Sequence, residues 1–364
     1  MSFKFRVRKF MKLFKSLLVA PATLGLLAPI AATANEVTIN DFNPAEELAI
    51  TNSRVDGLEA RLNNFEAGSF STTTSATFGS NFYVGAVDGG TVGTPPVAAE
   101  AVTFTYDFSM GLSTTFTGED SLDVAVIGGN AGTTAVDGYM GGDNTSDALT
   151  LDGISYTFPL GGATIIVGDG VGVDDMNTGA CAYSAFTDLL GDCGTSSVGG
   201  SADSAIAVGY DFGNGFTVAG GVGGGDSTAG YFTEEDKSTI GLEVAYTADA
   251  YGVSVAYTDD EASTYWSIQA MAAPEGYPSI SVGFETDDDD ADAIFAGLTF
   301  DEIGPGSVSL GMASTALSSD DYYQYELSYS YPLNDSITVT PGVFITETST
   351  EDDTGVVVTT SFSF

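Results

Sequence analysis

Histidine is absent from this 364-residue sequence, which also has only two cysteines and nine lysines or arginines. Without histidine the chain lacks the usual general base, so histidine-activated serine or cysteine nucleophiles are excluded. Two cysteines without histidine also cannot assemble the common zinc sites. We therefore expect no enzymatic activity and no resident cofactor.

The few basic residues are concentrated at the start of the chain. A mostly apolar run over 17–30 is followed by Ala32-Thr33-Ala34, which has the small-residue pattern of a cleavage site. Six basic side chains precede that run: Lys4, Arg6, Arg8, Lys9, Lys12 and Lys15. This pattern predicts a secretory signal peptide over 1–34. The alternative is a transmembrane helix, but the apolar run is shorter than the roughly 20 residues that a span requires.

Beyond residue 34 only Arg54, Arg61 and Lys237 oppose 50 Asp and Glu residues. Such an acidic chain repels phosphate backbones, so nucleic acid is excluded as a partner. The 17 Tyr, 23 Phe and 46 Gly are atypical of a disordered acidic chain. A folded, β-rich, exported protein is indicated. Export to an oxidising compartment favours a disulfide between Cys181 and Cys193 over a metal or redox role.

A heptad pattern over 48–65 predicts a short coiled coil within a periplasmic segment, 35–70. The apolar or Thr positions are spaced three and four residues apart: Leu48, Thr51, Val55, Leu58, Leu62 and Phe65. This helix would support self-association. The alternative is an amphipathic helix that packs on the same chain.

From residue 71 onward, period-two alternation predicts about sixteen β-strands, the first at 72–86 and the last at 355–364. Short connections such as 118–120 and 213–215 alternate with long, mostly acidic ones such as 129–148 and 170–202. Short turns at one rim and long loops at the other are typical of an outer-membrane β-barrel with periplasmic turns. The predicted fold is thus an all-β, antiparallel, transmembrane barrel over 71–364, and a soluble β-sandwich is the alternative.

The strand faces favour the barrel. In one strand Phe104, Tyr106 and Phe108 share one face and alternate with Thr105 and Asp107 on the other. An apolar outer face and a polar lumen produce this pattern. The carboxylates predicted to line the pore on this basis are Asp107, Asp123, Asp211, Glu243, Glu285 and Glu326. Rings of carboxylates without basic residues favour cations.

The longest loop, 170–202, contains both cysteines. A loop closed by a disulfide is able to fold inward and narrow the channel; the alternative is an exposed surface loop. Its four predicted constriction carboxylates are Asp174, Asp175, Asp188 and Asp192. A further acidic run, 287–292, suggests at most weak Ca²⁺ or Mg²⁺ binding or a bridge to lipopolysaccharide, because it lacks the EF-hand spacing.

Several stretches resemble the cyanobacterial outer-membrane porins of the Som type, which are related to the carbohydrate-porin family OprB. They are "SRVDGLEARLNNFEAGSFSTTT", "TTFTGEDSLDVAVIGGN", "LDGISYTFPLGGATIIVG" and "VGYDFGNGFTVAGGV". The resemblance implies a trimeric, 16-stranded barrel for small solutes, with the third external loop as its constriction. Two departures are expected: the S-layer-homology domain usual in such porins is missing, and so are most of their lysines and arginines.

The last ten residues, "GVVVTTSFSF", alternate like a final outward-facing strand and end on Phe362 and Phe364. This end resembles the C-terminal signal of outer-membrane proteins, which implies recognition by the barrel insertion machinery. We expect a homotrimeric porin of the outer membrane that passes small hydrophilic solutes and prefers cations. The alternatives are a carbohydrate-selective porin, or a closed barrel that serves as a surface anchor.

Overall fold

A computed structural model describes residues 74–88, 101–132, 134–199, 204–224, 231–233, 238–289, 291–314, 322–349 and 351–364. The chain divides into two units, Met1–Ser69 and Phe70–Phe364, and all of the described residues belong to the second. The predicted signal peptide (1–34) and coiled coil (48–65) lie outside the described residues.

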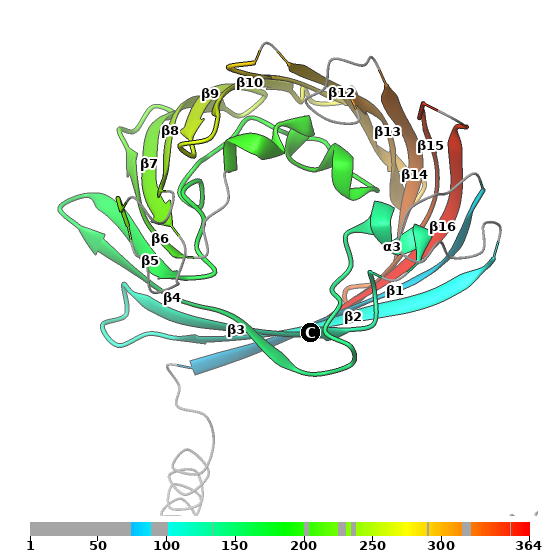
Figure 1. The fold of residues 1–364 in the computed structure, drawn as a ribbon, viewed down its shortest axis with the longest axis horizontal. Coiled ribbons are helices and arrows are strands. Elements are labelled where there is room, and N and C mark those ends of the chain that lie inside the picture. The colour runs from blue at the N-terminus through cyan, green and yellow to red at the C-terminus, as the bar shows by residue number, and fades with distance from the viewer. Residues whose placement is uncertain are drawn as a thin grey trace, which may run out of the picture. The chain divides into compact units, whose positions relative to one another are not determined.

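Sixteen antiparallel strands form one closed barrel in which every strand pairs with its neighbours in sequence and β1 pairs with β16. The predicted fold class and strand number are confirmed (Figure 1). The strands are β1 (Thr74–Asp88), β2 (Thr103–Thr114), β3 (Ser121–Gly129), β4 (Thr150–Leu160), β5 (Ala163–Asp169), β6 (Ser204–Asp211), β7 (Phe216–Gly224), β8 (Ser238–Ala248), β9 (Tyr251–Asp259), β10 (Thr264–Ala272), β11 (Ser279–Asp287), β12 (Asp292–Ile303), β13 (Gly306–Ser314), β14 (Tyr323–Asn334), β15 (Ile337–Thr346) and β16 (Asp353–Ser363).

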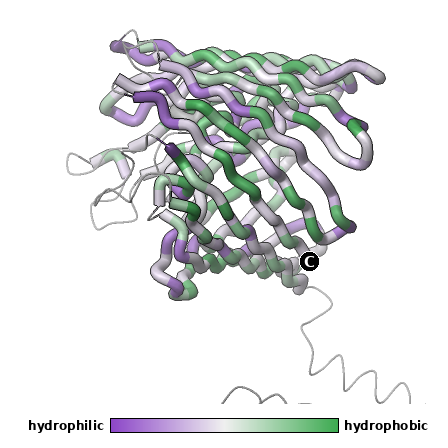
Figure 2. The backbone as a smooth tube through the Cα atoms, turned by 90° about the vertical axis from the view of Figure 1, so that its right-hand side faces the viewer, coloured by the Kyte–Doolittle hydropathy of each residue, from purple (hydrophilic) through white to green (hydrophobic). Residues whose placement is uncertain are grey.

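Side chains alternate between the two faces of the barrel wall, as the period-two pattern predicts. In β8, Leu242 and Val244 are exposed on the outer face, while Glu243 and Ala245, which alternate with them, are buried on the inner face. Figure 2 shows the same alternation of hydrophobic and hydrophilic residues along the strands. The inner face is therefore polar, and the outer face carries the large apolar side chains.

The barrel closes where the last strand meets the first. The backbone N–H of Phe78 donates to Phe364 O at 2.8 Å, and the N–H of Phe364 donates to Phe78 O at 3.0 Å. The rings of these two residues stack with centroids 5.7 Å apart, and Phe82 meets Phe362 edge-on at 5.6 Å. The aromatic C-terminus thus completes both the hydrogen-bond ladder and an aromatic cluster at this seam.

Two long connections lie inside the barrel: L2, residues 130–149, and L3, residues 170–199 (Figure 1). L2 contains helix α3 (Ala135–Met140), and L3 contains the 3₁₀ helices η3 (Asp188–Gly194) and η4 (Ser196–Gly199). The sequence pattern did not indicate these helices. No helix in the described part of the chain is long and apolar enough to cross a membrane.

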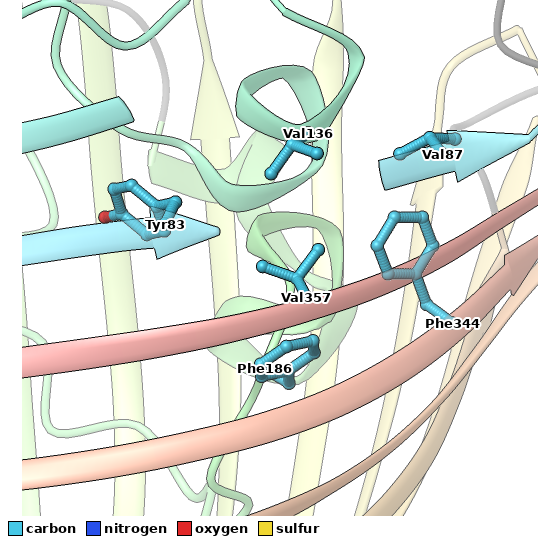
Figure 3. Packing of buried hydrophobic residues seen from close by; sticks show 6 residues of the cluster. All are labelled: Tyr83, Val87, Val136, Phe186, Phe344 and Val357. Atoms are coloured by element: carbon cyan, nitrogen blue, oxygen red, sulfur yellow. The ribbon is translucent and has the colours of Figure 1, made fainter. Parts of the chain in front are cut away.

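The hydrophobic core lies between these loops and the barrel wall. Its largest cluster joins Val136 of α3 and Phe186 of L3 to four wall residues (Figure 3). Those four are Tyr83 and Val87 of β1, Phe344 of β15 and Val357 of β16. Because β1 and β16 are the two strands that close the barrel, both loops stabilise the seam from inside.

Candidate functional site

L3 follows the inner wall from β5 to β15 and leaves β2 to β4 uncovered (Figure 1). Glycines on the wall make this close approach possible: a Cβ at Gly283 would lie 2.0 Å from Cys193 O, and one at Gly342 would lie 2.4 Å from the Phe186 ring. Any larger residue at either position would force the loop away from the wall. The loop therefore narrows the lumen from one side.

Glu326 of β14 holds the tip of L3. Its carboxylate accepts hydrogen bonds from the backbone N–H groups of Phe186 and Thr187, both at 2.8 Å, and from the hydroxyls of Tyr183 at 2.8 Å and Thr187 at 2.5 Å. Glu326 is only 2% exposed. Four donors satisfy the acceptor sites of a buried carboxylate without a basic partner.

Glu243 of β8 holds the start of L3 in the same way, accepting from the N–H groups of Thr178 at 2.6 Å and Gly179 at 3.1 Å. Between these two anchors, Gln269 of β10 accepts from Ala180 N–H at 2.8 Å and donates to Asp192 O at 2.7 Å. Gln269 was not among the predicted lumen residues, which were all carboxylates, although its place on the inner face of β10 follows from strand alternation.

Two more of the predicted pore-lining carboxylates, Asp107 and Glu285, are buried on the inner face. Asp107 accepts from the Tyr83 hydroxyl at 2.6 Å and from the Asn81 side-chain amide at 2.9 Å. Four of the six predicted residues therefore lie on the predicted face, but are covered rather than presented to the lumen. The reason is that inward loops, which strand alternation does not reveal, lie over them.

The other two predicted carboxylates are more accessible. Asp123 of β3 is half-buried and accepts from the Ser121 hydroxyl at 2.6 Å; it lines a cavity of about 240 Å³ on the wall that L3 leaves uncovered. Asp211 is exposed at the end of β6, next to the short turn, and accepts from Gly213 N–H at 2.7 Å.

The predicted constriction carboxylates belong to the inward part of L3. Asp175, Asp188 and Asp192 are exposed, whereas Asp174 is half-buried. Asp174 lines a cavity of about 340 Å³ between L3 and strands β8 to β10. Burial, and to a smaller extent the charge of Asp192, raises the pKa of Asp174 above its ordinary value.

A disulfide bond joins Cys181 to Cys193 within L3. Cys193 is buried against Leu190 and Phe295, and its backbone, like that of Asp192, has a positive φ. Gln269 and Thr195 hydrogen-bond to Asp192 O at this turn. The covalent link and these hydrogen bonds hold the loop in one compact shape.

L2 narrows the lumen beside the barrel seam. Its helix α3 is attached to the wall by Asp137, which accepts from the Thr105 hydroxyl, and by Tyr139, which donates to Asp353 at 2.5 Å. Asp143 of L2 has a raised pKa because of burial, and then because of the charges of Asp107 and Asp152. L2 therefore adds to the lumen a carboxylate that was not among the predicted pore-lining residues.

No lysine, arginine or histidine occurs among the described residues, so no two of them form an ion pair between a carboxylate and a basic side chain. Within the same residues, no group of three or more Asp, Glu, His or Cys side chains could hold a metal ion. Within the described part of the chain, hydrogen-bond donors alone oppose the negative field inside the barrel, and ions from solution screen it further.

Comparisons with known proteins identify similar chains. The sequence model of the Gram-negative porin family matches residues 41–353. An uncharacterized protein of Nostoc sp. is 34% identical over 139 residues, a match that covers 36% of this chain and 23% of the length of the Nostoc protein.

Two solved structures share the fold. Pseudomonas putida OprB at high pH has a TM-score of 0.59 at 13% identity, and the match covers 80% of this chain and 94% of that one. A mutant of the Rh. blastica porin has a TM-score of 0.56 at 14% identity, and the match covers 80% of this chain and 100% of that one.

Proposed function

This chain belongs to the Gram-negative porin family, and we propose that its barrel, an outer-membrane porin channel, passes small hydrophilic solutes passively and prefers cations. The observation that supports the cation preference is the charge of the side chains around the lumen. Carboxylates occur on the wall and on both inward loops, while the described residues contain no basic side chain. The family and the fold indicate a channel rather than an enzyme.

The preference arises at the narrow part of the lumen. Asp175, Asp188 and Asp192 of L3 are exposed to water, and Asp123 lies on the wall that L3 leaves uncovered. In a narrow passage between low-dielectric walls, their field raises the local concentration of cations and lowers that of anions. Salt weakens this effect, because the Debye length is only about 10 Å at 0.1 M ionic strength.

Planar-bilayer recordings of the purified protein in a gradient of potassium chloride test the proposal. We expect stepwise conductance with a reversal potential on the cation side. A reversal potential on the anion side would overturn the cation preference, and the absence of conductance steps would favour a closed barrel that serves as a surface anchor.

The same recordings at decreasing pH give a second readout. Burial raises the pKa values of Asp174 and Asp143, so these groups bind protons at a higher pH than ordinary carboxyl groups. As the pH falls, the two loops therefore begin to lose negative charge at a pH above about 4, the ordinary pKa of a carboxyl group. The reversal potential should move towards zero over that interval, and a reversal potential that is constant down to pH of about 4 would contradict this assignment.

We also propose roles for three segments that lie outside the described residues. Residues 1–34 act as a cleaved signal peptide, 35–70 form a periplasmic segment, and the coiled coil of 48–65 supports a homotrimer in contact with lipid and lipopolysaccharide. The support is the sequence pattern alone: the basic start, the apolar run and the heptad spacing.

Phe362 and Phe364 are proposed as the signal read by the insertion machinery. Deleting Phe364 removes both of its backbone hydrogen bonds to Phe78 and the stacked ring at the seam. The deletion should lower the yield of folded barrel in the outer membrane, while the channels that do assemble keep their conductance. The variant Phe364→Tyr, which keeps the ring and the backbone, is the control. Normal yield of the deletion variant would contradict the proposed signal.

A further inference from the structure

Strand β4 contains a β-bulge where it pairs with β3. Gly153 pairs with Ala125, but the next pair is Leu151 with Val126, so Asp152 is an additional residue without a partner in β3. A bulge of this kind interrupts strict alternation and changes the direction of a side chain. The charged residue Asp152 thus occupies the position of β4 at which the alternation of inward and outward side chains is interrupted.

The exposure of the neighbouring residues shows what the bulge does. Leu151 and Ile154 are both on the outer face, 61% and 42% exposed, although residues three apart in a regular strand face opposite sides. Strict alternation from Ile154 would place Asp152 on the outer face and Leu151 in the lumen. An acidic side chain facing the bilayer and an apolar one facing water would both be unfavourable.

Two observations place Asp152 on the lumen side. It lines the 240 Å³ cavity together with inner-face residues of β1 to β4, namely Thr77, Ser113, Asp123 and Ser155. Its charge also contributes to the raised pKa of Asp143 in L2, which lies inside the barrel next to Asp107. The carboxylate of Asp152 is therefore close enough to Asp143 for the two charges to interact.

We infer that Asp152 is a selectivity-determining residue of the channel, turned by the β4 bulge into the lumen on the wall that L3 leaves uncovered. This inference rests on the proposed cation preference. Unlike Glu243 and Glu326, which are buried as anchors of L3, Asp152 is exposed, so its charge acts directly on ions in the water-filled passage. It acts through its field on passing ions, and it does not require a bound ion.

The test compares wild type with Asp152→Asn, which keeps the shape of the side chain and removes its charge. We expect the cation-over-anion permeability ratio to fall by about twofold in 0.1 M salt, because water and salt screen the effect of a single carboxylate on a passing ion. The single-channel conductance and the thermal stability of the barrel should hardly change. Asp249→Asn, in the short turn between β8 and β9, changes an exposed carboxylate outside the predicted pore lining; it is the matched control and should leave the ratio unchanged.

A second variant tests the bulge. Deleting Asp152 brings Leu151 next to Gly153, which restores regular alternation with Leu151 outside and Gly153 inside. The deletion should therefore fold and should lower the permeability ratio as much as Asp152→Asn does.

The outcomes separate this inference from the proposed function. A wild-type channel without cation preference overturns both of them. A cation-selective wild type whose ratio is unaffected by Asp152→Asn overturns only the inference, as does an equal change in Asp249→Asn. A reduced ratio in Asp152→Asn alone supports both.

Discussion

Glu326→Gln is expected to give a wider and noisier channel than wild type. The carboxylate of Glu326 accepts four hydrogen bonds from L3, two of them from backbone N–H groups. An amide replaces one acceptor oxygen by a donor, so at least one buried donor of L3 loses its partner, at a cost of about 1–3 kcal/mol. The tip of L3 should then leave the wall part of the time.

Single-channel recordings measure this directly, as a higher mean conductance with larger fluctuations in the open state. Glu119→Gln is the control, because Glu119 is exposed in the turn between β2 and β3 and far along the chain from L3. Glu326→Ala should show a larger effect than Glu326→Gln. If all three variants conduct like wild type, the four hydrogen bonds do not hold the constriction in place.

Phe344→Ala is expected to cause the largest loss of stability in the barrel. The ring is only 1% exposed, its centroid lies 4.5 Å from that of Tyr139 in α3, and it fills the space that Gly355 of β16 leaves free. Truncating a buried phenylalanine costs about 3–5 kcal/mol, because the lost contacts leave a cavity behind. The contact that is weakened is the one between α3 and the strands that close the barrel.

Thermal unfolding of the detergent-solubilised barrel, followed by circular dichroism, measures the effect. Val343→Ala changes the adjacent residue of β15, whose side chain is 44% exposed on the outer face, and should cost much less. If the two variants unfold at the same temperature, the interior cluster does not stabilise the seam. A second consequence, detectable by limited proteolysis from the loop side, is faster cleavage within L2 in Phe344→Ala.

Glu243 and Glu326 show why strand alternation predicts the faces of the barrel wall better than it predicts which residues line the open lumen. Alternation identified the inner face of β8 and β14 correctly, because strand geometry requires period two wherever one face is apolar. It gave no information on what covers that face. Glu243 and Glu326 were therefore predicted to line the pore, although L3 lies over both and uses them as anchors.

β4 shows the opposite case. Alternation counted from Ile154 places Asp152 on the outer face, and only the register between β3 and β4 shows the additional residue that turns it inward. A bulge depends on which residue of one strand pairs with which residue of the next. That register is set between strands and cannot be read from one strand alone.

The sequence by itself determined the sixteen strands, their polar and apolar faces, the short and long connections and the excess of acid over base. These properties follow from local periodicity and composition. The tertiary structure decided which carboxylates meet water, because only the folded chain brings L2 and L3 against the wall. Burial of a carboxylate needs several donors around it, and the donors for Glu326 come from residues about 140 positions earlier in the chain. Such contacts between distant residues exist only after the barrel has closed.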